Sequence, residues 1–151
     1  MNVYRISRCK FISNLTGTGA ATFGGRWNSK GIHILYTAAT PSLALLESVV
    51  HISNIPVDDY CMATIEIPEN KIKEIRFIDL PVNWFLNPAP DQLKSIGDKF
   101  IKDNIFLALK LPSAIMMEDF NYLLNPDHPD FSIVKLIATR TIPIDERLRK
   151  K

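Results

Sequence analysis

The sequence predicts a compact single domain of the α+β class, with a mixed, mainly antiparallel β core and a few helices. Its 151 residues are about the length of one ordinary domain, and 46% of them are hydrophobic, which is enough for one buried core. Segments with strand character outnumber segments with helix character, and the two kinds do not alternate strictly. A parallel, doubly wound sheet requires that alternation, so the α+β arrangement is favoured.

The first half of the chain predicts three strands and one helix around a glycine-rich segment. Five of the six glycines lie within 17–31, where we expect a loop that turns tightly or approaches a ligand closely. A mostly buried helix is expected over 42–53, because Thr40 supplies an N-cap, Pro41 suits the first position, and apolar residues recur at helical spacing. Strands are expected over 3–6, 32–37 and 60–67.

The second half predicts further strands and one more helix. The helix is expected from Asp91 to about Asp103, and 121–130 is expected to be a loop because Asn-Pro and His-Pro pairs favour turns. The end of the chain is charged and predicts a frayed tail, which divides the chain into a domain over 1–144 and a tail over 145–151. Strands are expected over 72–78, 105–109, 114–117 and 132–144.

Charge and cysteine content restrict the partners and the compartment. The 18 Lys and Arg residues face 16 Asp and Glu residues, and the net charge of +2 is too even for non-specific nucleic-acid binding. No apolar run approaches the ~20 residues of a membrane span, and no secretory signal is visible. Cys9 and Cys61 allow one disulfide, but a chain of this size needs no covalent staple, so a reducing compartment fits best. We therefore expect a soluble cytoplasmic protein.

The helix expected over 42–53 has a narrow polar sector without lysine or arginine. Glu47 and His51 lie in it one turn apart, whereas the leucines, valines and isoleucine cover the broad remaining side. Two interpretations follow from this pattern. Either Glu47 and His51 line a cleft, or Glu47 meets only solvent or a structural arginine.

The glycine-rich segment leads into Gly24-Gly25-Arg26-Trp27-Asn28, a candidate anion site. The guanidinium of Arg26 is a planar fork of donors that suits a pyrophosphate, although an arginine here can equally be a structural ion-pair partner. The segment lacks the endings of a Walker loop and of a dinucleotide-binding fingerprint. Zinc, thiol and serine-hydrolase chemistry receive little support, because their motifs are absent and the three histidines are scattered.

Taken together, these motifs resemble the RES domain, the toxin half of bacterial RES/Xre toxin–antitoxin pairs. Each motif alone is weak, but their order and spacing make a specific signature over nearly the whole chain. The matching pieces are Tyr4-Arg5, Gly17-Thr18-Gly19-Ala20, Gly24-Gly25-Arg26-Trp27-Asn28, Leu35-Tyr36-Thr37-Ala38, Leu43-Ala44-Leu45-Leu46-Glu47, Leu111-Pro112-Ser113-Ala114 and Asn121-Tyr122-Leu123-Leu124-Asn125-Pro126.

The resemblance implies a fold similar to the ADP-ribosyltransferases and an enzyme that consumes NAD. Members of this family break the bond between nicotinamide and ribose by hydrolysis or phosphorolysis, or transfer ADP-ribose to a protein, and loss of NAD arrests growth. NAD is then the substrate, phosphate a possible co-substrate, and no metal or prosthetic group is needed. The implied partner is an Xre-type helix-turn-helix antitoxin, which leaves DNA binding to that protein.

The resemblance also assigns an active-site set: Arg26, Tyr36, Glu47 and Ser113, with Arg5 facing the dinucleotide. Glu47 is expected to stabilise the ribosyl cation, and both arginines are expected to hold the pyrophosphate. Tyr36 is expected to stack on nicotinamide or adenine. Ser113 is expected to bind the nicotinamide amide or to position water or phosphate. The alternative from another class is a non-catalytic nucleotide-binding module, in which Glu47→Ala leaves function intact.

Overall fold

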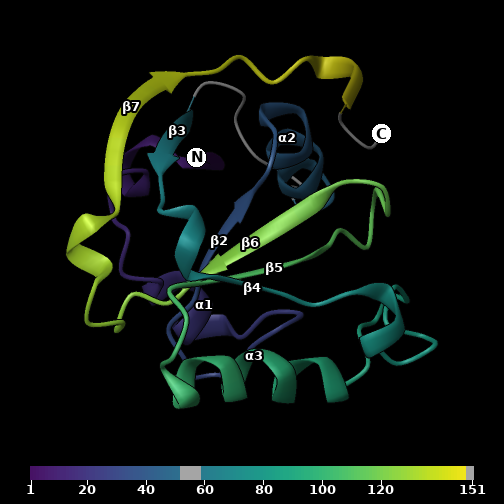
Figure 1. Cartoon of the computed structure of the whole chain (residues 1–151). Coiled ribbons are helices and arrows are strands. Elements are labelled where there is room, and N and C mark those ends of the chain that lie inside the picture. Colours follow the sequence, from purple (N-terminus) through teal and green to yellow (C-terminus); the bar gives the residue numbers. More distant parts are fainter. Residues whose placement is uncertain (52–58, 149–151) are drawn as a thin grey trace.

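The computed structural model describes residues 1–51 and 59–148, which form one seven-stranded sheet flanked by short helices (Figure 1). The strand order is β4-β5-β6-β2-β1-β3-β7, with β4 and β5 parallel and the other pairs antiparallel. This arrangement confirms the α+β class. The strands are β1 (Asn2–Arg8), β2 (Leu35–Ala38), β3 (Tyr60–Glu66), β4 (Ile72–Glu74), β5 (Ala108–Pro112), β6 (Phe120–Leu124) and β7 (Lys135–Thr141).

Two of the helices cover the same face of the sheet. In the register, Tyr4 lies opposite Ala38, which lies opposite Asn121, so these residues point to one side, called here the α2 face. Helix α2 packs there on the Tyr4 side, and α3 packs on Leu109 and Leu123 at the other end. Figure 1 shows the two helices at opposite ends of the fold with β5 and β6 between them. The helices are α1 (Thr18–Phe23), α2 (Pro41–Val49) and α3 (Gln92–Asp103).

Helix α3 closes tightly on the segment that holds the candidate anion site. Its Leu93 and Phe100 are buried among Trp27, Ile34 and the leucines of β5 and β6. Gly97 allows this approach, because a Cβ there would lie 1.8 Å from the carbonyl oxygen of Trp27. Asp98, the next residue, accepts hydrogen bonds from the amide and hydroxyl of Ser29. The loop after α1 is therefore held in place by α3.

Several expected elements differ from the structure. The glycine-rich segment contains α1, because Gly17 and Gly24 adopt positive φ and bound a helical turn between them. Residues 114–117 form a turn, since the Ser113 hydroxyl accepts the amide N–H groups of Ile115 and Met116 that a strand would use. The loop expected over 121–130 begins only after β6, and the strand expected over 72–78 ends at Glu74.

Helix α2 begins as expected but is shorter and less buried. The Thr40 hydroxyl accepts the amide of Leu43 at 3.1 Å, and Pro41 occupies the first turn. The helix ends at Val49, and the part expected beyond residue 51 lies outside the described residues. Only Leu43 and Ala44 are buried, so the expectation of a mostly buried helix was wrong. Its remaining apolar side chains pack partly against β1 and β3.

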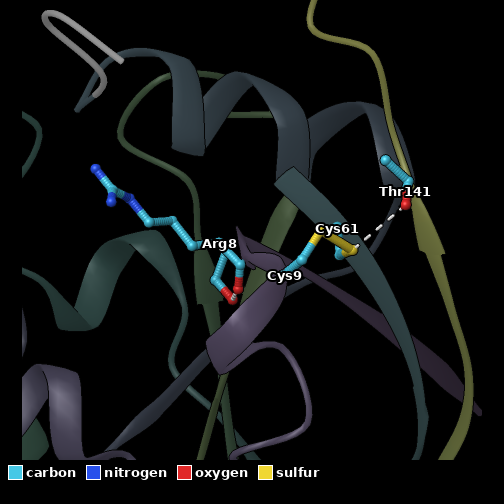
Figure 2. Close-up of a disulfide and its surroundings, with 5 residues drawn as sticks. Arg8, Cys9, Cys61 and Thr141 are labelled. Carbon is cyan, nitrogen blue, oxygen red and sulfur yellow. Dashed lines mark hydrogen bonds between the residues drawn. A yellow bond between two sulfur atoms is a disulfide. The ribbon is translucent and has the colours of Figure 1, made fainter. Parts of the chain in front are cut away.

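Cys9 and Cys61 form the one disulfide that the sequence allows, although a reducing compartment was expected (Figure 2). The pairing of β1 with β3 brings the two residues together, since Ser7 lies opposite Cys61 and the Cys9 amide donates to the Asp59 carbonyl. Their Cα atoms are 4.8 Å apart despite a separation of 52 residues. Neither sulfur is thus available as a thiol nucleophile in this state.

Candidate active site

The candidate site lies on the α2 face, where Glu47 meets the ends of β5 and β6. Helix α2 is tied to this region at its start, because the Thr40 hydroxyl donates to Asp119 Oδ2 at 3.0 Å. Asp119 belongs to the turn that joins β5 to β6. The same connection orients Glu47, two turns into the helix, toward Ser113 and Asn121.

One oxygen of the Glu47 carboxylate accepts two hydrogen bonds. Oε1 receives the Ser113 hydroxyl at 2.8 Å and the Asn121 side-chain amide. Ser113 is completely buried, and its oxygen already accepts the amides of Ile115 and Met116, so its single proton goes to Glu47. The two donors come from different elements and hold the carboxylate in one orientation.

The other oxygen of Glu47 remains available. Within 1–51 and 59–148, Oε2 accepts no hydrogen bond, and no buried side-chain nitrogen or oxygen lacks a partner. Glu47 is half-buried, so its unpartnered Oε2 reaches solvent. The site thus presents one free carboxylate oxygen on a rigid support. The interpretation in which Glu47 meets only solvent or a structural arginine does not hold, because Ser113 and Asn121 bind its carboxylate.

Arg26 is anchored by backbone carbonyls and has no acidic partner among the described residues. Its Nη1 donates to the carbonyl oxygens of Trp84 at 2.9 Å and Leu86 at 3.1 Å. Burial lowers the pKa of Arg26, whereas the Glu47 carboxylate and Tyr36 act in the opposite direction. Arg26 therefore lies within electrostatic reach of Glu47, and among the described residues its Nε and Nη2 make no hydrogen bond, which leaves them for an anion.

Tyr36 supports the loop that carries Arg26. Its hydroxyl donates to Asn28 Oδ1 at 2.7 Å and accepts the amide N–H of Trp27 at 3.1 Å. Asn28 is fully buried and satisfied, since its side-chain amide also donates to three carbonyl oxygens. Burial is the main cause that raises the pKa of Tyr36. The hydroxyl is thus occupied by the protein, and only the ring is left for a ligand.

Arg5 is not brought together with the other predicted site residues. It lies opposite Ala63, and neighbouring residues of a strand point to opposite faces, so Arg5 leaves the sheet on the side away from Tyr4 and α2. Its Nη1 donates to the carbonyl oxygens of Phe11, Ile12 and Asn14 at 3.0–3.2 Å. Burial lowers its pKa. In this structure Arg5 braces the loop that follows β1.

His51 and Asn121 differ from what the sequence indicated. His51 follows α2 as an exposed residue, and within the described part of the chain its side chain makes no hydrogen bond to Glu47. Asn121 lies in one of the matching motifs, but the active-site set implied by the resemblance does not include it, and the sequence predicts a loop there. The signal for it is the alternation of 120–124, which places Asn121 and Leu123 on the α2 face.

The described residues contain neither a cluster of metal ligands nor a membrane-spanning helix. Within residues 1–51 and 59–148, no three His, Cys, Asp or Glu side chains gather as metal ligands would. Among the same residues, no helix is both long enough and apolar enough to span a bilayer.

Comparison with known proteins identifies the family. Residues 2–145 match the RES domain. The chain is 36% identical over 152 residues to "Toxin Res" of Yersinia enterocolitica, covering 99% of this chain and all of the relative. It is 35% identical to "Prs ADP-ribosylating toxin" of a Sphingobium strain, covering 91% and 88%. The toxin–antitoxin complex MbcT-MbcA of M. tuberculosis contains a chain of similar fold, with a TM-score of 0.74, 14% identity and coverage of 94% and 84%. This chain therefore belongs to the RES domain family.

Proposed function

We propose that this protein is the toxin of a toxin–antitoxin pair and that it degrades NAD by cleaving the bond between nicotinamide and ribose. The observation that supports this most directly is the carboxylate of Glu47, which Ser113 and Asn121 hold through one oxygen and whose other oxygen has no partner among the residues that the structure describes. Family membership and the names of its curated relatives support the toxin role.

The chemistry of NAD suits such a carboxylate. Nicotinamide is cationic in NAD and leaves as a neutral molecule, so positive charge develops on the ribose rather than on the leaving group. A fixed negative oxygen stabilises that charge most strongly in the transition state. Glu47 Oε2 accepts a hydrogen bond from a ribose hydroxyl in this proposal, and the contact strengthens as the glycosidic bond breaks.

The remaining groups divide between binding and support. The free donors of Arg26 bind the pyrophosphate, because a guanidinium fork matches two phosphate oxygens. The ring of Tyr36 contacts nicotinamide or adenine. Ser113 is fully buried with its hydroxyl already engaged, so we assign it to hold Glu47 instead of touching the nicotinamide amide or an attacking water.

Bond cleavage is completed by an acceptor on the ribose carbon that nicotinamide leaves. With water, the new C–O bond gives ADP-ribose and one proton is released. With inorganic phosphate, the product is ADP-ribose 1-phosphate at the same carbon. Both routes use the same stabilised cation, so the site as described serves either one.

Transfer of ADP-ribose to a protein is the second candidate. It is favoured by one relative, at 35% identity, whose name is "Prs ADP-ribosylating toxin". The ribosyl cation that Glu47 stabilises is common to both reactions, and only the acceptor differs.

We further propose that the protein is neutralised by an Xre-type helix-turn-helix antitoxin. The likeness to a chain from a toxin–antitoxin complex supports an antitoxin partner, and the Xre type is the part that the family resemblance suggests.

The test is to incubate the purified chain with NAD, with and without phosphate, and to measure nicotinamide and ribosyl products. Wild type should release nicotinamide, and Glu47→Gln should be slower by roughly a hundred-fold, the scale of losing one preorganised electrostatic group. Exposed Glu69→Gln is the matched control and should behave as wild type. No release, together with labelling of a lysate protein by radioactive NAD, would favour transfer. If the protein neither releases nicotinamide nor labels a lysate protein, both enzyme proposals are contradicted.

A further inference from the structure

We propose that Asn121 is a positioning residue that determines, together with Ser113, which oxygen of Glu47 faces the substrate. The inference deepens the proposed function and rests on it for the identity of the substrate. Asn121 does not need to touch NAD for this role, because it acts through the carboxylate.

The backbone of Asn121 is fixed on both sides. Strand β6 lies inside the sheet, where Asn121 pairs with Leu111 of β5 and with Ala38 of β2. A side chain on an interior strand is held more precisely than one on a loop. Ser113, the other donor, follows β5 and is fixed by its own turn. Both donors are therefore positioned by β5, β6 and the turn between them, whereas α2 carries Glu47.

The hydrogen bonds permit one orientation of both side chains. A carboxylate oxygen accepts but cannot donate, so the amide nitrogen of Asn121, rather than its carbonyl oxygen, must face Glu47 Oε1. With the Ser113 proton on the same oxygen, Oε1 has two donors, whereas Oε2 has none within 1–51 and 59–148. A single donor leaves the carboxylate free to turn about that bond. The second donor fixes the plane, and Oε2 stays directed at the site.

Asn121→Asp tests this arrangement because it keeps the shape of the side chain and replaces the donor by a second carboxylate. Like charges side by side disfavour the ionised form, so Glu47 should ionise at a pH roughly one unit or more higher. Asn70→Asp adds the same charge at an exposed position and is the matched control. The titration of Glu47 is followed by carbon NMR of labelled glutamate carboxyl groups, with Glu47→Gln used to identify the signal.

Activity supplies the second readout. Asn121→Ala should lower kcat for nicotinamide release by about tenfold or more, the scale of removing a supporting partner, while KM for NAD changes much less. A folded Asn121→Ala protein with unchanged kcat would overturn the proposal, as would superimposable titrations of Asn121→Asp and Asn70→Asp. If Asn121→Asp fails to fold, the titration of Asn121→Ala should still move to higher pH, because a donor to the charged form is lost.

The two arms separate this inference from the proposed function. The NMR titration needs no NAD and no turnover. A shifted titration in a protein that does not cleave NAD would support the positioning role and contradict the proposed substrate. Normal cleavage of NAD by a protein with an unshifted Glu47 titration would support NAD as the substrate and contradict the positioning role of Asn121.

Discussion

Gly25 occupies a position where any side chain would collide with the groups that support Arg26. A Cβ on Gly25 would lie 2.6 Å from the Tyr36 hydroxyl oxygen and 2.8 Å from Asn28 Oδ1. A Cβ on Gly19, in α1, would meet no atom within 4 Å. The absence of a side chain is therefore required at Gly25 by close contacts but not at Gly19, six positions earlier in the same segment.

Gly25→Ala should lower the free energy of unfolding by about 1–3 kcal/mol, because the methyl group forces apart a buried hydrogen-bonded pair. Gly19→Ala should leave stability unchanged or raise it by up to about 1 kcal/mol, since alanine is the better helix former. Urea unfolding of both variants makes the comparison. Equal stability of the two would show that the loop moves aside at no cost.

Arg26→Lys separates charge from geometry at the candidate anion site. Lysine keeps the positive charge but has no fork, so it cannot hold two carbonyl oxygens and a pyrophosphate at once. We expect KM for NAD to rise about tenfold or more, with little loss of stability. Arg76→Lys is the control, because Arg76 is exposed and pairs with its neighbour Asp79. Unchanged kinetics would remove Arg26 from substrate binding.

At the scale of elements, Thr40 connects the start of α2 to the turn between β5 and β6. Its hydroxyl caps the helix and donates to Asp119. Thr40→Ala should lower the free energy of unfolding by about 1 kcal/mol through loss of the cap, and further through loss of the bond to Asp119. Because the link orients Glu47, kcat should fall as well. Thr40→Ser retains the hydroxyl and should preserve both properties. Thermal unfolding and nicotinamide release measure the two effects.

The elements that could be predicted are those whose signal is local. The Thr40-Pro41 cap, the helix ending at Asp103 and the strand after Tyr60 follow from nearby residues, and the structure has all three. Strand β6 was missed because Pro126 and the His-Pro pair after it suggested a loop, while its stability comes from pairing with β2 and β5. Propensity cannot show a strand that is stabilised mainly by its neighbours.

The candidate site was predictable to a similar degree. The motifs pointed to Arg26, Tyr36, Glu47 and Ser113, and the structure links Ser113 to Glu47 directly and places Arg26 and Tyr36 near one another. Two features depend on strand register, which the sequence does not reveal. These are the donation of Asn121 to Glu47 and the placement of Arg5 on the opposite face of the sheet. The role of each residue toward NAD stays a prediction.

At the scale of the whole molecule, the disulfide closes a loop of 52 residues that contains β2, α2 and Glu47. Linking the chain there restricts the unfolded state, which by the chain-entropy model stabilises the fold by about 4 kcal/mol.

Cys61→Ser should therefore lower the unfolding free energy by roughly 2–4 kcal/mol. Because the Cys61 position shares the face of Arg5 rather than that of Glu47, kcat of the folded variant should stay near that of wild type. Urea unfolding with and without reductant, beside nicotinamide release, measures both, and a large loss of kcat would contradict this placement.

The groups that surround Glu47 come from distant parts of the chain, and this has a consequence during translation. Helix α2 is synthesised early, but the two donors to its carboxylate lie at positions 113 and 121 of 151. A nascent chain that has not yet reached β6 holds Glu47 without the Asn121 donor, and one that ends before Ser113 lacks both donors. On the proposed function, the full support of Glu47 therefore forms only once β6 has been synthesised, and we expect a fragment that stops before β6 to cleave NAD more slowly than the whole protein.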